Sequence, residues 1–365
     1  MNVVRNLVQS LNRRRLRSAA DLAMAGLIPP DRADTVARAA GALPVALTPD
    51  IAGLIDVQDP DDPIARQFIP DAREAEWQPG EHADPIGDGA HQAVKGVIHR
   101  YPDRALLTPL LTCPVYCRFC FRREQVGAGA LSEAELDAAL DYIQSRNEIW
   151  EVILSGGDPL ALSDRRLDRI IGALDAIDHV EVIRIHSRVP AVDPGRVTEA
   201  LANLLKRDTP VYVVLHCNHA RELTDTARAA ISRLVDGGIP MLSQTVLLKG
   251  VNDNAADMEA LMRALVRCRV KPYYLHHPDL ARGTGHFRTT LAAGQTLMRR
   301  LRGRLSGIAQ PTYILDIPGG FGKAPVGPGY LETRADGAYL VKDWQGGQHC
   351  YQDSAQPIEP PTSSC

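Results

Sequence analysis

Short apolar runs alternate with longer amphipathic patterns from about residue 104, and this alternation limits the possible folds most strongly. The runs are RALLTPLL, WEVILSGG, VEVIRIHSR, VYVVLHCNH, PMLSQTVLL, PYYLHHPD and TYILDIPGG. Apolar residues with helical spacing fill 131–146, 163–177, 193–207, 222–237, 254–268 and 289–304. Six strand-then-helix units of this kind predict a parallel sheet covered by helices, in a full or partial barrel.

The segment 131–146 shows the helical signal most clearly. Ser132 and Glu135 have the spacing of a capping box, in which each side chain bonds the backbone N–H of the other residue. The apolar residues from Leu136 to Ile143 then recur at every third or fourth position. We therefore expect a helix that begins directly after Ser132.

Polar and glycine residues collect at the C-terminal ends of the expected strands. These ends are SGGDP, HSR, HCNH, SQT, HHPD and DIPGG, and Cys113 follows the first run. Barrels of parallel strands place their chemistry at this end. The site is therefore expected there.

The chain divides into four expected parts. Residues 1–95 are mixed and punctuated by proline, which predicts a mostly helical extension of loops and short helices. Its arginine-rich start lacks the apolar core of a signal peptide, so we expect an amphipathic surface helix over residues 1–27. The barrel would span 96–310 and a closing segment 311–335. The Gly/Pro/Ser-rich tail, 336–365, is expected to be partly disordered or draped on the surface.

Composition excludes several classes of protein. The formal net charge of −3 argues against a general nucleic-acid or membrane-surface binder. No run approaches the roughly 18 apolar residues of a membrane-spanning helix. Seven cysteines, three of them clustered, do not indicate a disulfide framework. We expect a cytoplasmic protein that binds neither nucleic acid nor membrane.

The three clustered cysteines lie in LLTCPVYCRFCFRRE, where Cys113, Cys117 and Cys120 form a C-x3-C-x2-C array. Their sulfurs can turn toward a common point, and three thiolates fit a four-iron cluster with one iron left open. Phe119 would cover that cluster on one side. A zinc site, with His216 or His219 as the fourth ligand, and buried free thiols are the alternatives.

Lys323 stands out in the glycine-rich turn LDIPGGFGKAPVGPGY. Only six of the 41 basic residues are lysines, so a lysine in a turn that looks buried is notable. Lysine forms Schiff bases and arginine cannot, which makes pyridoxal 5′-phosphate (PLP) the natural partner. An ordinary surface lysine is the alternative.

Taken together, these motifs resemble a known family. C-x3-C-x2-C after a first barrel strand, with SGGDPL after the second, resembles the radical S-adenosylmethionine (SAM) enzymes. HRYPDRALL, SQTVLLKGVND, PYYLHHPDLARGTGHFRT and DIPGGFGKAPV, in this order, resemble lysine 2,3-aminomutase. The resemblance runs from about residue 48 to 335. It implies an α/β fold with a partial (β/α)6 radical SAM barrel, an N-terminal helical extension and a short C-terminal extension.

The resemblance also implies three cofactors. Cys113, Cys117 and Cys120 would hold a [4Fe–4S] cluster, whose open iron binds SAM. The residues that would line the SAM site are Ser155, Gly156, Gly157, Asp158 and His216. Lys323 would be the catalytic residue and would bind PLP covalently. The residues that would lie near the PLP phosphate are Arg100, Tyr101, Arg104 and Gln244.

L-Lysine is the substrate that the resemblance implies. Arg122 would bind its carboxylate, and Asp279 and Asp316 its side-chain ammonium. The aspartates make independent sense, because a buried ammonium needs a counter-charge, whereas glutamate would be repelled. A 5′-deoxyadenosyl radical, formed with an electron from an external donor, would start the transfer of the amino group from carbon 2 to carbon 3, giving β-lysine.

Some features depart from the family pattern. Phe119 replaces a histidine of the clostridial-type enzymes, and CRFCFRR resembles the branch that makes β-lysine for elongation factor P. Larger members of the family bind zinc through a C-terminal cysteine cluster at a subunit contact. This chain has Asn254 at the matching upstream position and only Cys350 and Cys365 in its tail, so no such zinc site is expected. Whether the protein forms a homo-oligomer stays open. Three further functions stay open: a 2,3-aminomutase for another amino acid, a radical SAM enzyme without PLP and a non-catalytic iron–sulfur electron carrier.

Overall fold

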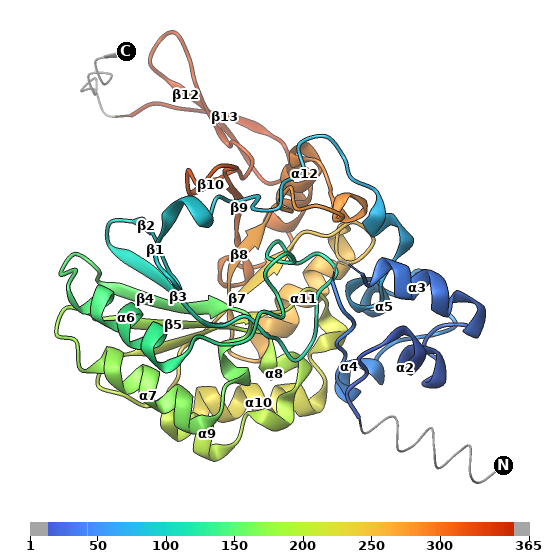
Figure 1. Ribbon diagram of the computed structural model, residues 1–365. Helices are drawn as coiled ribbons and strands as arrows, with labels where there is room; N and C mark the ends of the chain where they lie inside the picture. Colours follow the sequence, from blue (N-terminus) through green and yellow to red (C-terminus); the bar gives the residue numbers. More distant parts are fainter. Residues whose placement is uncertain (1–13, 42, 354–365) are drawn as a thin grey trace.

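A computed structural model describes residues 14–41 and 43–353 and has one large sheet at its centre (Figure 1). The sheet has ten strands in consecutive order, β1 to β10. Its strands are β1 (Gln92–Val94), β2 (Val97–Tyr101), β3 (Arg104–Leu110), β4 (Glu151–Gly156), β5 (Val182–Ser187), β6 (Val211–His216), β7 (Met241–Val246), β8 (Lys271–His276), β9 (Thr312–Asp316) and β10 (Lys323–Pro325). β3 to β9 pair in parallel, and all seven expected strands are confirmed.

Helices follow the parallel strands and cover one face of the curved sheet (Figure 1). They are α6 (Glu133–Gln144), α7 (Asp164–Asp175), α8 (Val189–Val192), α9 (Glu199–Leu204), α10 (Asp225–Asp236), α11 (Ala255–Arg267) and α12 (Leu291–Arg302). The six expected strand–helix units are confirmed, although the third has the short helices α8 and α9 instead of one helix over 193–207. Pro194 disfavours helical geometry at Asp193, where α8 ends.

The expected capping box at the start of α6 is confirmed. The Ser132 hydroxyl accepts a hydrogen bond from the Glu135 N–H, and the Glu135 carboxylate accepts one from the Ser132 N–H. Leu136, Ala139 and Ile143 are fully buried on one face of the helix. Apolar side chains of this kind, from helices and strands together, form one continuous core beneath the sheet.

The N-terminal extension consists of short helices, as expected: α2 (Ala19–Met24), α3 (Ala33–Ala39), α4 (Pro49–Ala52) and α5 (Pro63–Phe68). Thr48 and Asp62 cap α4 and α5, each of which has proline at its first position. Of the surface helix expected over residues 1–27, residues 1–13 lie outside the described part of the chain and α2 is helical. The expectation is wrong for residues 14–18, because Leu16 is buried and pairs with Leu47 in a β-bridge.

Antiparallel hairpins flank the parallel strands at both edges of the sheet. β1 and β2 precede β3, and β10 folds back on β9. The sheet therefore crosses both expected boundaries, at 95/96 and at 310/311. No pairing between β1 and β10 closes the sheet within the described residues, so the barrel is open.

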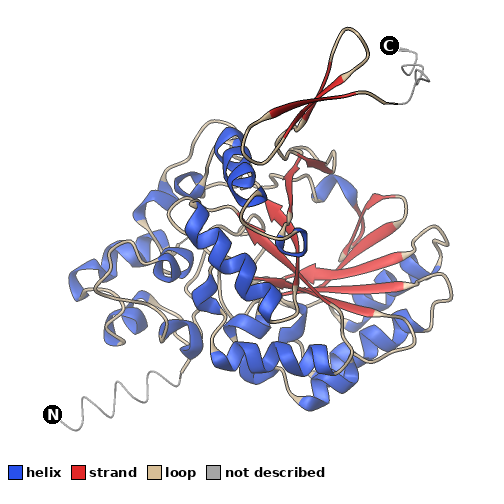
Figure 2. Cartoon of the chain, turned by 180° about the vertical axis from the view of Figure 1, so that it is seen from behind, coloured by secondary structure: helices blue, strands red, loops and turns tan. Residues whose placement is uncertain are grey.

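The C-terminal region differs from expectation. β11 (Leu331–Thr333), β12 (Tyr339–Lys342) and β13 (Gln348–Tyr351) form a second, antiparallel sheet that projects from the main body (Figure 2). The expected loose tail is therefore wrong for 336–351, because polar turns there connect short strands rather than free chain. Residues 354–365 lie outside the described chain. No helix in the described ranges is long and apolar enough to cross a bilayer.

Candidate active site

The loop after β3 carries the cysteine array. Cys113, Cys117 and Cys120 are partly buried and none forms a disulfide. A turn in which the Cys120 N–H donates to the Cys117 carbonyl, at 3.0 Å, turns the loop back on itself. Burial raises the pKa of each thiol, to about 11 for Cys120, and neighbouring thiols raise the pKa of Cys113 and Cys120 further. The array therefore includes one tight turn, from Cys117 to Cys120, and Cys113 precedes that turn.

The arrangement of ligands separates an iron–sulfur cluster from a zinc ion. Within residues 14–41 and 43–353, no three His, Cys, Asp or Glu side chains are placed to hold one metal ion. In a [4Fe–4S] cluster each thiolate binds a different iron, so the sulfurs surround a larger group. His219 is also engaged, because its ring accepts a hydrogen bond from the Arg221 N–H. The donor set thus fits the cluster and gives the zinc alternative no support.

Arg188, at the end of β5, contacts the array and was not among the expected site residues. Its guanidinium donates to the Cys117 Sγ at 2.7 Å and pairs with the buried carboxylate of Glu222 at 2.8 Å. Arg188 also lies over the Phe119 ring, 5.7 Å from its centroid. Phe119 in turn contacts the His216 and Phe287 rings. The sequence did contain a signal for Arg188, because this residue is the arginine of the HSR segment at the end of an expected strand.

The turn after β4 is bound tightly to the cysteine loop. A Cβ on Gly157 would lie 2.4 Å from the Thr112 carbonyl oxygen, and the Gly157 N–H donates to the Leu110 carbonyl at 2.6 Å. Gly156 has a φ of +99° and equally little space. The glycines are therefore required by the neighbouring strand, which is a reason additional to the close ligand approach expected from the sequence.

The Asp158 carboxylate has a structural role in this turn. Its two carboxylate oxygens accept four hydrogen bonds, from the Ser187 hydroxyl and from the N–H groups of Leu160, Arg188 and Val189. All of these bonds are internal to the protein. The carboxylate therefore fixes the turn, and only the backbone of Asp158 is left for contact with SAM.

Several strand ends present buried nitrogen atoms without partners. The Nε2 atoms of His186, His216 and His276 are buried and make no hydrogen bond with the described chain. Burial lowers the pKa of all three rings, so they are neutral near pH 7. Gln244 on β7 lies directly beside His216 on β6. Unpartnered polar atoms at this edge are suited to contacts with a bound ligand.

Lys323 and Asp316 are cross-strand partners in the β9–β10 hairpin. The Lys323 ammonium donates to the Asp316 carboxylate, whose other oxygen lies 3.3 Å from the His276 Nδ1. Burial alone would raise the pKa of Asp316, but His276 and Lys323 outweigh it and hold the pKa well below its usual range. The Lys323 side chain is 35% exposed, so the expectation of a buried turn is wrong: the neighbouring glycines are covered, whereas the lysine opens toward solvent.

Asp279 completes the expected carboxylate pair. Its Oδ1 atom is buried and has no partner within the described chain. Burial, and next the nearby charge of Asp316, raise its pKa to about 7, although Lys323 and Arg122 oppose this shift. Two neighbouring carboxylates, one of them unsatisfied, form a site for a cation. His276, which was not among the expected site residues, belongs to this group through its contact with Asp316.

Two of the expected anion-binding residues, Tyr101 and Arg104, lie close to the Lys323 backbone. The Tyr101 hydroxyl accepts a hydrogen bond from the Lys323 N–H at 2.8 Å, and Arg104 lies over the Tyr101 ring. Arg100 has a buried Nε without a partner among the described residues. Arg122 is 9% exposed and donates to the Ser155 hydroxyl at 3.3 Å. Lys323 therefore contacts Asp316 through its ammonium and Tyr101 through its backbone.

Asp88 was not among the expected site residues, yet it links two of them. Its carboxylate lies 3.0 Å from Arg100 and 2.8 Å from Arg122. It precedes the short 3-10 helix η3 (Gly89–His91) in the N-terminal extension. No spacing rule in the sequence indicated where this carboxylate points.

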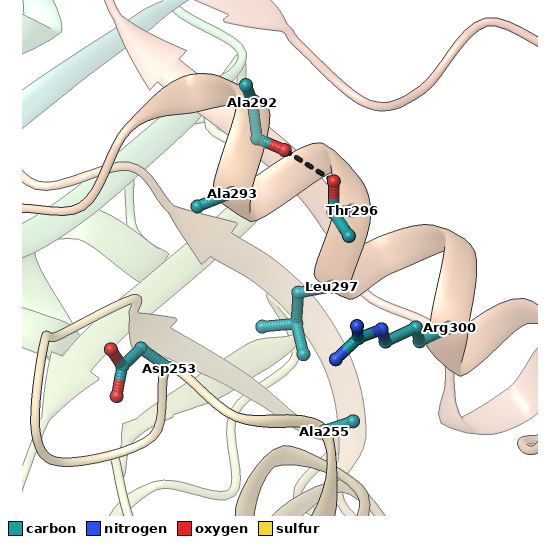
Figure 3. A pocket seen from close by; sticks show the side chains of 7 residues that line it. All are labelled: Asp253, Ala255, Ala292, Ala293, Thr296, Leu297 and Arg300. Carbon is teal, nitrogen blue, oxygen red and sulfur yellow. Dashed lines mark hydrogen bonds between the residues drawn. The ribbon is translucent and has the colours of Figure 1, made fainter.

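The cavity drawn in Figure 3 lies elsewhere, between the start of α11 and α12. It has a volume of about 350 Å³ and is lined by Asp253, Ala255, Ala292, Ala293, Thr296, Leu297 and Arg300. None of the expected site residues lines it. The chemistry is therefore concentrated at the strand ends and not in this cavity.

Sequence comparisons agree with the geometry. A model of the Radical SAM superfamily matches residues 107–265, so the fold and the cysteine array define a radical SAM enzyme, with the iron–sulfur cluster and SAM that this class uses. A model described as lysine-2,3-aminomutase matches residues 298–363. The L-lysine 2,3-aminomutase of Acetoanaerobium sticklandii is 40% identical over 336 residues, which cover 92% of this chain and 81% of the relative. The chain belongs to the lysine 2,3-aminomutase family of isomerases.

Two further relatives have different substrate names. The L-lysine 2,3-aminomutase of Clostridium subterminale is 41% identical, over 85% of this chain and 75% of the relative. The glutamate 2,3-aminomutase of Clostridioides difficile is 37% identical, over 82% of this chain and 72% of the relative. Family membership alone therefore does not identify the amino acid substrate, which has to be inferred from the site.

Proposed function

We propose that the protein moves the amino group of L-lysine from carbon 2 to carbon 3 and so forms β-lysine. The observation that carries this proposal is the carboxylate pair of Asp279 and Asp316 beside Lys323. The Lys323 ammonium already occupies one side of this pair, which is therefore able to accept an alkyl ammonium. When the Lys323 nitrogen is engaged elsewhere, the side-chain ammonium of a lysine substrate can take its place.

PLP is part of the proposal, and the residues around Lys323 fit it. Lys323 is the only lysine among the expected site residues, and its partly exposed amine can reach a carbonyl carbon. Arg100, Tyr101, Arg104 and Gln244 are the proposed contacts for the PLP phosphate. PLP, when bound, delocalises the unpaired electron that SAM chemistry generates on the substrate.

The chain's own residues bind and orient the substrate. Arg122 would bind the substrate carboxylate, for which a planar guanidinium is well suited. Asp279 and Asp316 would hold the other end of the molecule. The buried, neutral rings of His186, His216 and His276 contribute no competing positive charge. An external electron donor and a cytoplasmic location belong to the same proposal.

Glutamate is the second candidate because a relative is named for it, but the charges disfavour it. A glutamate side chain would place a third carboxylate beside Asp279 and Asp316, whose mutual repulsion already raises the pKa of Asp279. Arginine, another cationic amino acid, would be attracted. Use of the product for elongation factor P would involve the same reaction and is an alternative pathway rather than an alternative chemistry.

The direct test is an anaerobic assay of protein reconstituted with iron, sulfide, PLP and SAM, with a strong reductant. L-Lysine, L-glutamate and L-arginine would be supplied separately, and α- and β-amino acids separated by mass spectrometry. We expect β-lysine from lysine and no β-amino acid from glutamate. An enzyme that cleaves SAM but forms no β-amino acid from any of the three would overturn the proposal.

The PLP part has a separate spectroscopic test. Lys323→Ala should abolish the visible absorbance of a PLP–lysine Schiff base, and Lys323→Arg should do the same while keeping the charge beside Asp316. Lys249→Ala is the matched control, because Lys249 also lies next to a glycine but is exposed on the loop after β7. Persistence of the absorbance in both Lys323 variants would refute this assignment.

A further inference from the structure

The segment 84–91 of the N-terminal extension forms one wall of the site. A Cβ on Gly87 would lie 2.7 Å from the backbone of Gly319 and Gly320, so the two turns are in direct contact. The His91 ring lies 3.1 Å from the Gly320 carbonyl oxygen. A part of the chain outside the βα units is thus packed against the turn that carries Lys323 (Figure 1).

Asp88 lies in the middle of this wall and is only 5% exposed. Its Oδ1 accepts a hydrogen bond from the Arg100 Nη2 at 3.0 Å. Its Oδ2 accepts from the Nε of Arg122 at 2.9 Å and lies 2.8 Å from the Nη2 of the same side chain. One carboxylate therefore holds two guanidinium groups that are expected to bind different ligands.

The contacts determine which edge of each guanidinium remains available. Asp88 holds the Nε–Nη2 edge of Arg122, so the outer edge, Nη1 with Nη2, is left for a second, bidentate carboxylate. The Nη1 atom has only the 3.3 Å contact with Ser155 among the described residues. On Arg100, Nη2 is held by Asp88 and the Ile86 carbonyl, whereas the buried Nε has no partner in the described chain.

The balance of charge also indicates that Arg100 and Arg122 bind anions. Two guanidinium groups share one carboxylate, so this group of three side chains retains one positive charge. Removing that charge from water is unfavourable unless an anion compensates it. A phosphate at Arg100 and a carboxylate at Arg122 are the anions that the proposed reaction provides.

We propose that Asp88 is a positioning residue that orients Arg100 toward the cofactor phosphate and Arg122 toward the substrate carboxylate. The inference rests on the proposed function, since it needs an amino acid at Arg122. Asp88 touches neither ligand and acts through the two arginines. Because both arginines share it, loosening Asp88 weakens cofactor and substrate binding together.

The test compares Asp88→Asn with wild type for two ligands that differ only at the carboxylate. L-Lysine and L-lysinamide would be measured as substrate and as competitive inhibitor, respectively. We expect the KM for lysine to rise by about tenfold or more, since a charge-assisted contact that orients Arg122 is lost. Inhibition by lysinamide should change by less than about twofold, because it has no carboxylate for Arg122 to bind.

PLP affinity gives a readout that needs no turnover. Absorbance titration of PLP-free protein should show a Kd several-fold higher in Asp88→Asn. The Asp88→Asn change should add little further weakening when Arg100→Met is already present, because both act on one contact. Asp88→Glu keeps the charge and should shift both readouts in the same direction by less, which preserves the test if the asparagine variant does not fold.

Asp84→Asn is the matched control. The Asp84 carboxylate accepts hydrogen bonds from the Asp88 and Gly89 N–H groups but contacts neither arginine. It should lower the thermal midpoint without changing the ratio of lysine to lysinamide affinity. Equal weakening of both ligands in the Asp88 variants, with an unchanged Kd for PLP, would overturn the inference. An inactive wild-type enzyme would instead refute the proposed function.

Discussion

Two groups of buried charges lie close to the cysteine loop, and they differ in how completely they are paired. Beneath the loop, Glu74 binds Arg118 and Arg123, and both guanidinium groups are further bonded to backbone carbonyls. Around Lys323, by contrast, Asp279 retains a buried oxygen without a partner among the described residues. A completely paired network fixes the structure, whereas an incompletely paired one is completed by a ligand. This difference in pairing distinguishes residues that hold the structure from residues of the candidate active site, without comparison with any homologue.

Removing Glu74 should give the largest effect on stability. Glu74→Ala would leave two almost fully buried arginines without their counter-charge, which costs about 3–5 kcal/mol. That is a large part of the roughly 5–15 kcal/mol that stabilises a typical protein. Urea unfolding of the purified protein would measure the loss.

Glu133→Ala is the matched control for Glu74. Glu133 also bridges two arginines, Arg166 and Arg169, but its side chain is 64% exposed. Its removal should change stability by less than about 1 kcal/mol. Similar losses in the two variants would show that burial does not distinguish these networks.

Asp279→Asn should reduce activity strongly and stability only slightly, in contrast to Glu74→Ala. Its unpartnered oxygen contributes no hydrogen bond within the described chain, so the variant should lose no more than about 1 kcal/mol of stability. The value of kcat/KM for lysine should fall by about 100-fold, or ~2.7 kcal/mol, because a counter-charge for the ammonium is lost. Steady-state assays and thermal unfolding on the same preparations would measure both. A variant that is unstable but fully active would place Asp279 in the scaffold.

The pKa of Asp279 predicts a pH dependence of binding. Only the ionised carboxylate attracts an ammonium, and the pKa lies at about 7. Between pH 8 and pH 6 the KM for lysine should therefore rise by up to about tenfold. Asp279→Asn should remove this dependence. A wild-type KM that is constant over this range would contradict the assignment.

The same group predicts how stability changes with pH. The pKa of Asp279 is raised on folding, so the folded state retains a proton that the unfolded chain has lost. This contribution to stability is present at low pH and disappears as the pH rises to about 7. The pKa of Asp316 is lowered, so its contribution has the opposite sign and is lost only in acid. Thermal midpoints of wild type and Asp279→Asn should converge as the pH falls.

Ser132→Ala should have a small effect that is confined to stability. It removes the side-chain cap of α6 and should cost about 1 kcal/mol. None of the expected site residues lies on α6, so cluster content and kcat should stay at wild-type values. Iron analysis and thermal unfolding would test this, and a loss of iron would show that α6 also supports the array.

Much of the fold could be predicted from local patterns. Strands β3 to β9 are short apolar runs, and the capping box of α6 fixed the start of that helix. The hairpins at the two edges of the sheet and strands β11 to β13 were not expected. They are short, polar and held by long-range or turn-dependent pairing, which leaves no periodic signal in the sequence.

The site was predictable where a residue type is chemically unusual. Three clustered cysteines and a rare lysine in a glycine turn are such signals. Asp88 and Arg188 were missed because aspartate and arginine are common, and only the folded chain brings Asp88 to Arg122 or Arg188 to Cys117. The role expected for Asp158 was incomplete for the same reason, since its four partners come from three separate elements.

The open sheet has a consequence for the order in which the molecule is assembled. Its two edges meet at Tyr101 and Lys323, which are 222 positions apart, rather than along a strand ladder. During synthesis, β1 and β2 are made before the strands at the other edge of the sheet. Their strand edges therefore stay unpaired until nearly the whole barrel has been synthesised. The contact between Tyr101 and Lys323 can therefore form only after nearly the whole sheet has been synthesised.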